Sequence, residues 1–236
     1  DRDDIWARMR RLMEMKKPGA AQLVARHLPA REAPDARKLE AVIDNPARYL
    51  ARLPGNFATN RPGRELALFA IARVARGDPA VVVSQWRAIE HRFDKAERAY
   101  VWGQIAWQAA LNHLPEALEW YALAGGATLS EEQLAWQARA ALRAQDWPRL
   151  AQAVADMPPR LAGQPEWVYW AGRALAAQGS PEEATRLFER ISGQPNFYGN
   201  LADEELGRAI VVPPRASSPS AEELAAVRAN PGLRRA

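Results

Sequence analysis

A spacing of 34 residues is the feature that most limits what this chain can fold into. Good helix N-cap residues recur at that interval, and so do an apolar anchor and an alanine four residues after it. The caps are Asp44, Asp78, Asn112, Asp146 and Ser180; the anchors are Leu68, Trp102, Trp136 and Trp170; the alanines are Ala72, Ala106, Ala140 and Ala174. Residues four apart share a helix face, where an alanine lets another helix approach closely. The spacing predicts helix hairpins, because it matches a tetratricopeptide-type repeat.

Start signals along the chain also favour helices. Ser130, Ser180 and Ser220 are each followed three residues later by Glu or Gln, the reciprocal capping pattern of a helix N-terminus. No run of strand length alternates apolar and polar residues. We therefore predict an all-α fold, a superhelical solenoid of antiparallel helix hairpins with a period near 34 residues. In such packing Ala140→Leu should force two helices apart and cost about 1–3 kcal/mol.

Proline-rich stretches divide the chain. Pro54-Gly55 marks a weak boundary, and residues 211–219 contain three prolines, which break helices. We predict N-terminal helices in residues 1–53, helix-hairpin repeats in 54–210, a proline-rich linker at 211–219 and the first helix of a further, truncated region at 220–236. An ending one helix beyond a linker leads us to expect that the chain is part of a larger protein.

The charge is unevenly distributed. Residues 1–100 carry 20 Lys and Arg against 13 Asp and Glu, whereas residues 101–236 carry 12 against 15. A polyanion would therefore meet the first half, but no basic run or aromatic RNA-binding string accompanies the charge, so we expect no nucleic-acid partner. The longest apolar run, residues 66–72, is far shorter than the roughly 18 residues of a membrane span, and without cysteine no disulfide or thiolate site can form.

The sequence contains no recognisable catalytic motif. His27, His91 and His113 lack metal-ligand spacing, and no phosphate-binding loop or nucleophile elbow occurs. The paired acids lie in predicted first turns of helices, where the helix dipole favours a carboxylate; they are Glu131-Glu132, Glu182-Glu183 and Glu222-Glu223. The run Asp203-Glu204-Glu205 lacks this explanation, and we expect most of it to be solvated. We predict no catalytic, cofactor-binding or metal-binding residue.

Nine tryptophans are many for a chain of 236 residues. The three periodic ones are predicted to pack between helices. Four others lie outside that register and are candidates for partial exposure: Trp86, Trp120, Trp147 and Trp167. Trp120 with Tyr121, and Trp167 with Tyr169, would then offer a stacking surface for a sugar or peptide. Core packing is the favoured interpretation of both pairs.

One part of the sequence resembles a known family. The string Asn196-Phe197-Tyr198-Gly199-Asn200-Leu201-Ala202-Asp203-Glu204-Glu205-Leu206-Gly207, with Tyr169-Trp170 and Arg173-Ala174-Leu175 before it, is similar to the end of the superhelical domain of soluble lytic murein transglycosylases. Trp102-Gly103 and Asp146-Trp147-Pro148 resemble the preceding repeats. The resemblance covers residues 64–210 well and is thin before them.

The resemblance implies a periplasmic enzyme that cleaves the glycan of peptidoglycan and leaves a 1,6-anhydro product. In the family a lysozyme-like domain that follows the superhelix carries the catalytic glutamate, in a Glu-Ser pair followed by a Gly-Leu-Met motif. This sequence contains neither string. We therefore expect a segment that is inactive by itself and positions peptidoglycan, its own catalytic domain or other cell-wall enzymes. The alternative is a stand-alone tetratricopeptide-like scaffold that binds a protein segment on its concave surface.

Overall fold

The computed structural model describes residues 1–210, 215, 217–230 and 232, and these residues form an all-helical fold without strands. The predicted fold class is therefore confirmed. The described residues form these α-helices: α1 (Arg2–Glu14), α2 (Pro18–Ala25), α3 (Ala36–Asp44), α4 (Pro46–Ala51), α5 (Arg61–Ala75), α6 (Pro79–Ile89), α7 (Lys95–Leu111), α8 (Ala117–Leu123), α9 (Glu131–Arg143), α10 (Trp147–Ala155), α11 (Pro159–Ala162), α12 (Pro165–Ala177), α13 (Pro181–Ile191), α14 (Phe197–Glu205) and α15 (Ala221–Ala229). Two short 3-10 helices, η1 (Phe57–Thr59) and η2 (Glu90–Arg92), lie between them.

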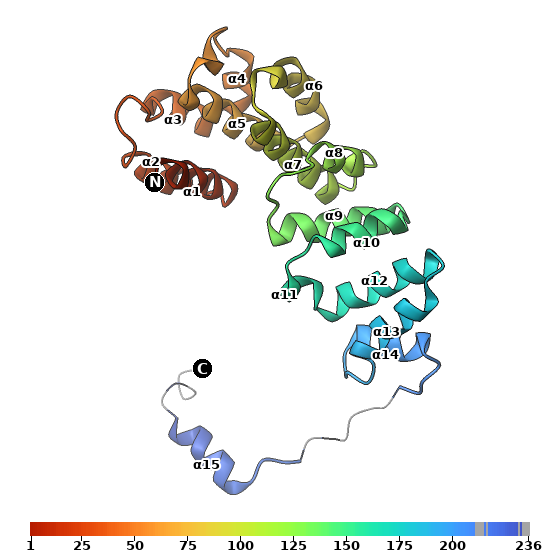
Figure 1. Ribbon diagram of the computed structural model, residues 1–236. Coiled ribbons are helices and arrows are strands. Elements are labelled where there is room, and N and C mark those ends of the chain that lie inside the picture. Colours follow the sequence, from red (N-terminus) through yellow and green to blue (C-terminus); the bar gives the residue numbers. More distant parts are fainter. Residues whose placement is uncertain (211–214, 216, 231, 233–236) are drawn as a thin grey trace.

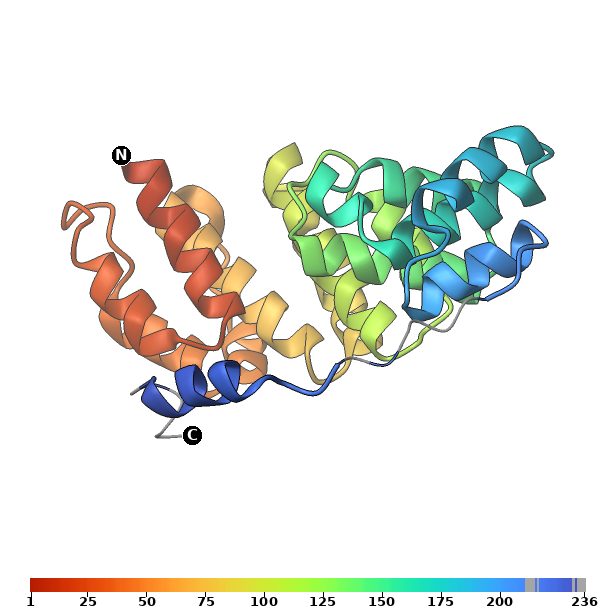
Figure 2. The same ribbon diagram turned by 90° about the horizontal axis from the view of Figure 1, so that it is seen from below.

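Successive helices pack against one another along a curved path. The pairs α7–α8, α9–α10 and α12–α13 are hairpins in close contact, and α10 also packs against α12. Figure 1 shows the path bending from α1 at one end to α14 at the other. In the perpendicular view of Figure 2 the first helices and α12–α14 again lie at opposite ends of the arc. Among the described residues, no helix has both the length and the apolar character needed to cross a membrane.

Two of the five periodic caps act as predicted. Asp78 accepts hydrogen bonds from the N–H groups of Ala80 and Val81, and Asp146 accepts one from Arg149. Each of these caps begins the second helix of a pair, α6 after α5 and α10 after α9, so the 34-residue interval reflects the repeated start of a second helix. Ser130 and Ser220 also form the predicted capping boxes, which confirms helices at Glu131 and Ala221.

The other three periodic caps differ from the prediction. Asn45 rather than Asp44 caps α4, because Pro46 occupies the first helical position. Asn112 follows the last residue of α7 instead of beginning a helix, because the next residue, His113, has a φ of 58° that a helix cannot accommodate. The side-chain amide of Asn112 donates to the carbonyl of Gln108. Ser180 precedes α13 as predicted but makes no side-chain capping bond.

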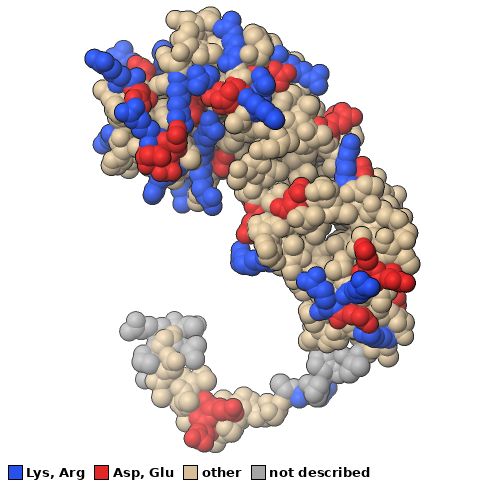
Figure 3. Space-filling view, in the orientation of Figure 1, with Lys and Arg blue, Asp and Glu red and all other residues tan. Residues whose placement is uncertain are grey.

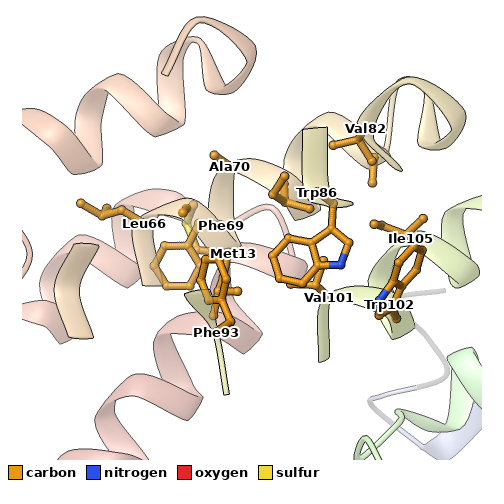
Figure 4. Close-up of a cluster of buried hydrophobic side chains, with 14 of the residues drawn as sticks. Met13, Leu66, Phe69, Ala70, Val82, Trp86, Phe93, Val101, Trp102 and Ile105 are labelled. Carbon is orange, nitrogen blue, oxygen red and sulfur yellow. The ribbon is translucent and has the colours of Figure 1, made fainter. Parts of the chain in front are cut away.

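The hydrophobic core is divided unequally along the arc. One large cluster joins side chains from Trp6 to Ala124, and part of it is shown in Figure 4. Trp86 lies at its centre with its ring centroid 5.0 Å from that of Phe93. A second cluster joins Leu118 to Ala174, and a third joins Val168 to Ala202. The later helices therefore share smaller cores with their immediate neighbours.

The tryptophans do not follow the predicted division by register. Of the periodic three, Trp102 is buried, whereas Trp136 and Trp170 are half-buried between clusters. Trp86, Trp120 and Trp167 lie outside the register and are buried, so the partial exposure considered for them is wrong; Trp147 is half-buried. Tyr121 and Tyr169 are buried as well, which excludes an exposed stacking surface at these two pairs.

The alanine register is confirmed at three positions out of four. Ala72, Ala106 and Ala174 are buried, as close helix approach requires. Ala140 is half-buried and lines a cavity of about 600 Å³ between the α7–α8 hairpin and α9. A leucine has room there, so Ala140 is a poor test of close packing.

The four-part division of the chain stays a prediction. Residues 211–214 and 216 of the expected linker lie outside the described residues. Pro54 and Gly55 separate α4 from η1, but Leu50 and Phe57 on either side belong to the same hydrophobic cluster. Helix α15 follows Ser220 and buries none of its residues.

Candidate functional site

A cavity of about 640 Å³ lies between α1, α7 and the segment that leads into α9. Figure 1 shows α1 to the left of α7 and the start of α9 below it. The polar side chains of its wall come from all three parts: Arg8, Arg10, Arg11, Glu14, Tyr100, Gln104, Thr128, Ser130 and Gln133. Concave sites lined by apolar surface with a few converging polar groups are the usual form of a ligand site.

Glu14 is the carboxylate in this wall. It is the last residue of α1, and its Oε1 accepts hydrogen bonds from the Tyr100 hydroxyl and the Gln104 side-chain amide, each at 2.9 Å. Both donors lie on α7 and are 86 and 90 residues away in sequence. Among the described residues, no hydrogen-bond donor and no cation pairs with Oε2. The side chain is therefore held through one oxygen while the other stays available.

The electrostatic surroundings of Glu14 are unfavourable for a carboxylate. Burial raises its pKa, against the lowering effects of the Tyr100 hydrogen bond and the charges of Arg76, Arg11 and Arg10. The C-terminus of a helix also carries partial negative charge. Arg76 offsets this charge by donating to the carbonyl oxygens of Met13 and Glu14 at 3.0 and 2.6 Å. A shifted acid in a cavity is a common sign of a functional site.

Buried ion pairs hold the cavity wall in place. Arg10 donates to both carboxylate oxygens of Glu65 at 2.7 and 2.9 Å, and Glu65 is fully buried. The same guanidinium lies 4.8 Å from the ring centroid of Tyr100. Arg64 pairs with the buried Glu97 through its Nε alone, which lies 2.9 and 3.1 Å from the two carboxylate oxygens. Helices α1, α5 and α7 are thereby fixed to one another, which fixes the position of Tyr100 against Glu14.

The second cavity, beside Ala140, has a more apolar wall. Trp136 and Leu118 face it, and the Arg139 guanidinium lies 5.2 Å from the centroids of both Trp136 and Trp167. The exposed His113 lies at its edge, with its ring centroid 6.3 Å from that of Trp136. None of the described residues that line this cavity carries a carboxylate.

The Phe-Tyr-Gly string has a structural explanation. A Cβ on Gly199 would lie 2.2 Å from the carbonyl oxygen of Gln194, so only glycine lets α14 approach the end of α13. Asp203 is buried and accepts hydrogen bonds from the Ser192 hydroxyl and the Gly193 N–H. Glu205 accepts from Tyr169 and Arg173 of α12 at 3.1 and 2.9 Å. The string therefore joins α14 to the preceding hairpin.

The acidic groups singled out in the sequence occupy different places. The three Glu pairs lie in the first turns of α9, α13 and α15, as predicted. In the run at residues 203–205 the two glutamates are exposed as expected, whereas Asp203 is buried. His27, His91 and His113 are exposed, and each lines a different cavity. Within the described part of the chain, no group of three or more His, Asp or Glu is placed to hold a metal ion.

Sequence reasoning missed Glu14, Glu65 and Glu97. Their partners come from helices 33 to 90 residues away, and no local motif connects such positions. One signal was present for Glu14, because an acid at the end of a predicted helix opposes the helix dipole. The basic excess of the first half was visible in composition, and Figure 3 shows the densest group of Lys and Arg over the N-terminal helices.

The described residues fold as an all-helical superhelix of stacked hairpins, and several solved structures have the same fold. One is an inactive mutant of the lytic transglycosylase Slt from Pseudomonas aeruginosa, with 23% identity and a TM-score of 0.69; the match covers 100% of this chain and 38% of that one. Another is the 70-kDa soluble lytic transglycosylase in complex with bulgecin A, with 22% identity, a TM-score of 0.60 and coverage of 92% and 36%. A third is the 70-kDa soluble lytic transglycosylase of Escherichia coli, with 23% identity, a TM-score of 0.60 and coverage of 88% and 34%. The fold is that of the superhelical region of such proteins.

This likeness establishes the fold. No protein-family model and no curated protein matches the sequence. The chain spans little more than a third of the length of the structures it resembles. The activity and substrate of the whole protein are therefore matters of proposal.

Proposed function

We propose that this chain is the superhelical region of a periplasmic lytic transglycosylase and that it positions peptidoglycan or partner proteins rather than cleaving glycan. The observation that carries the proposal is the fold likeness to Slt of Pseudomonas aeruginosa, which extends over the whole chain. The string at the end of the superhelix supports it, because Gly199, Asp203 and Glu205 each make contacts that close the last hairpin.

The contacts of the acidic residues support a positioning role. Glycoside cleavage usually needs one carboxyl group that can protonate the leaving oxygen. Glu65 and Glu97 are engaged in buried ion pairs, Asp203 holds the turn after α13, and the paired glutamates begin helices. Glu14 faces the cavity between α1 and α7 with one oxygen that accepts no hydrogen bond from the described residues. We assign it to binding, and the activity test below includes it for that reason.

Binding to the cell-wall polymer is the first test. The chain is mixed with purified insoluble peptidoglycan, and the fraction that sediments is measured against chitin, a neutral polymer of a related amino sugar. We expect specific sedimentation that weakens as salt rises from about 0.05 to 0.5 M, because the basic first half meets the carboxylates of the peptide stems. Absence of sedimentation at low salt would contradict the positioning of peptidoglycan and favour the binding of proteins, as in the alternative scaffold.

A second experiment tests whether the chain cleaves peptidoglycan. The chain is incubated with purified peptidoglycan, and soluble 1,6-anhydro products are separated by chromatography and identified by mass. We expect none above a blank. Products that vanish in Glu14→Gln would show that the cavity is an active site and would overturn the positioning role.

A further inference from the structure

We infer that the Glu14 cavity binds a free amino-acid end, a group that carries an ammonium and a carboxylate together. The inference rests on the proposed function for the source of that group, since peptide stems of peptidoglycan carry free carboxylates and amines. The residues that carry the inference are Arg8, Arg11 and Glu14 of α1 with Tyr100 and Gln104 of α7.

Charges of both signs lie in one stripe of α1. Arg8, Arg11 and Glu14 follow at intervals of three residues, so consecutive members are neighbours on one face of the helix, and all three line the cavity. Among the described residues neither arginine forms an ion pair, whereas the adjacent Arg10 is committed to Glu65. Two unpaired guanidinium groups beside one carboxylate match a ligand that carries an anion next to a cation.

The orientation of Glu14 assigns the cationic end. Its Oε1 is occupied by Tyr100 and Gln104, and the remaining oxygen is open to a donor from outside the protein. An ammonium supplies that donor and a compensating charge for a carboxylate at the negative end of α1. The carboxylate of the ligand then lies toward Arg11 and Arg8, one and two turns earlier in the helix.

The opposite wall can hold the peptide that bears this group. Thr128 and Ser130 offer hydroxyl groups, and Leu129 and Ala127 offer apolar surface between them. At about 640 Å³ the cavity is in the range of small-ligand sites. Because the charged groups of its wall suit an ammonium and a carboxylate, we expect the end of a stem rather than the glycan strand to enter.

The test uses the acetylated tripeptide Ala–γ-Glu–diaminopimelate, whose last side chain ends in an ammonium and a carboxylate. Calorimetry measures its binding to the full chain, beside two matched probes. In the first probe the side-chain amine is acetylated, and in the second lysine replaces diaminopimelate, which removes the side-chain carboxylate. We expect each change to weaken binding about tenfold or more, because each leaves one charge of the site unpaired.

Variants locate the binding. Glu14→Gln keeps the size of the side chain and should weaken binding of the free-amine probe about tenfold while leaving binding of the acetylated probe unchanged. Arg8→Gln with Arg11→Gln should reduce the preference for the diaminopimelate probe over the lysine probe. The exposed residues Glu40 and Arg37 of α3 provide the matched controls Glu40→Gln and Arg37→Gln, which should bind like the unaltered chain.

Three results would overturn the inference: no binding of the free-amine probe, equal binding of the acetylated probe, or full binding by a correctly folded Glu14→Gln variant. Circular dichroism and thermal unfolding establish the folding of each variant. The sedimentation test separates the two proposals. Sedimentation without probe binding leaves the proposed function intact and removes the cavity inference, whereas probe binding without sedimentation does the reverse.

Discussion

The first seven helices and the last six before residue 206 belong to one superhelix but are held together differently. In the N-terminal region, residues 1–111, buried ion pairs and hydrogen bonds connect helices far apart in the sequence: Arg10 with Glu65, Arg64 with Glu97, and Tyr100 with Glu14. In the hairpin region, residues 131–205, small cores join neighbouring helices, and the long-range ion pairs are partly exposed. Only the hairpin region approaches a simple nearest-neighbour stack.

The difference explains where the molecule has a rigid polar site. A carboxylate is kept in place inside a cavity only when its partners are themselves fixed. The N-terminal region provides this through Arg10, which binds Glu65 and lies over Tyr100. The hairpin region provides repeated apolar contacts, with the apolar cavity beside Trp136 at its start. The charged groups proposed to bind a ligand therefore lie in the first region, although the wall opposite them comes from the segment that leads into α9.

The largest expected effect comes from breaking the buried ion pair. Among the described residues, Arg10→Ala leaves the fully buried Glu65 with Arg61 as its one cation, whose Nε lies 3.3 Å away. We expect the free energy of unfolding, measured in urea, to fall by about 3–5 kcal/mol. The control in the hairpin region is Arg160→Ala, which removes the exposed pair with Glu131 and should cost about 0–1 kcal/mol. Similar losses in both variants would refute the contrast between the regions.

The next effect tests the hairpin region. Gly199→Ala places a Cβ against the carbonyl oxygen of Gln194 and should lower the free energy of unfolding by about 3 kcal/mol. In a nearest-neighbour stack the loss stays local, so hydrogen exchange should accelerate in α13 and α14 but not in α1–α7. Gly19→Ala in α2 is the control, because a Cβ there meets no atom within 4 Å and alanine favours a helix. Accelerated exchange throughout the chain would show one cooperative unit instead.

The 34-residue interval succeeded and failed in both regions. It identified the caps Asp78 and Asp146, one in each region, because local helix-start signals repeat there. In the N-terminal region the same interval placed a cap at Asp44, one residue before the true one at Asn45. The local choice was decided by Pro46, and the interval carried no information about it.

The Glu14 cavity could not be predicted from the sequence, because the 34-residue interval carries no information about it either. Glu14 looks like any exposed acid in the sequence, and its role depends on Tyr100 and Gln104, which the fold brings to it from α7. Burial of Asp203 depends likewise on the turn after α13. Periodicity reports which faces of helices are covered, whereas a polar site depends on pairings between distant helices. The fold class was therefore predictable and the site was not.

A smaller effect compares two alanines of one register. Ala106→Leu in α7 adds volume to a fully buried position and should cost about 2 kcal/mol. Ala140→Leu should be close to neutral, because its side chain can extend into the adjoining cavity. Thermal and urea unfolding of the two variants give the comparison. A larger loss at Ala140 would mean that this cavity closes in solution and that the register is uniformly packed after all.

The smallest effect concerns the pH dependence of stability. Burial raises the pKa of Glu14 in the folded chain, although Arg10, Arg11, Arg76 and the Tyr100 hydroxyl act in the opposite direction. Between the ordinary carboxyl pKa and the raised one, the folded state therefore holds more protons than the unfolded chain, and this group makes the free energy of unfolding fall as pH rises. Glu14→Gln removes that contribution, so its stability relative to the unaltered chain should increase across the same pH interval. Urea unfolding at several pH values measures the difference, with Glu40→Gln as the control for the loss of one carboxylate. A difference that does not change with pH would mean that the cavity is as well solvated as the surface, and the contrast between a rigid polar region and a stack of apolar hairpins would lose its main support.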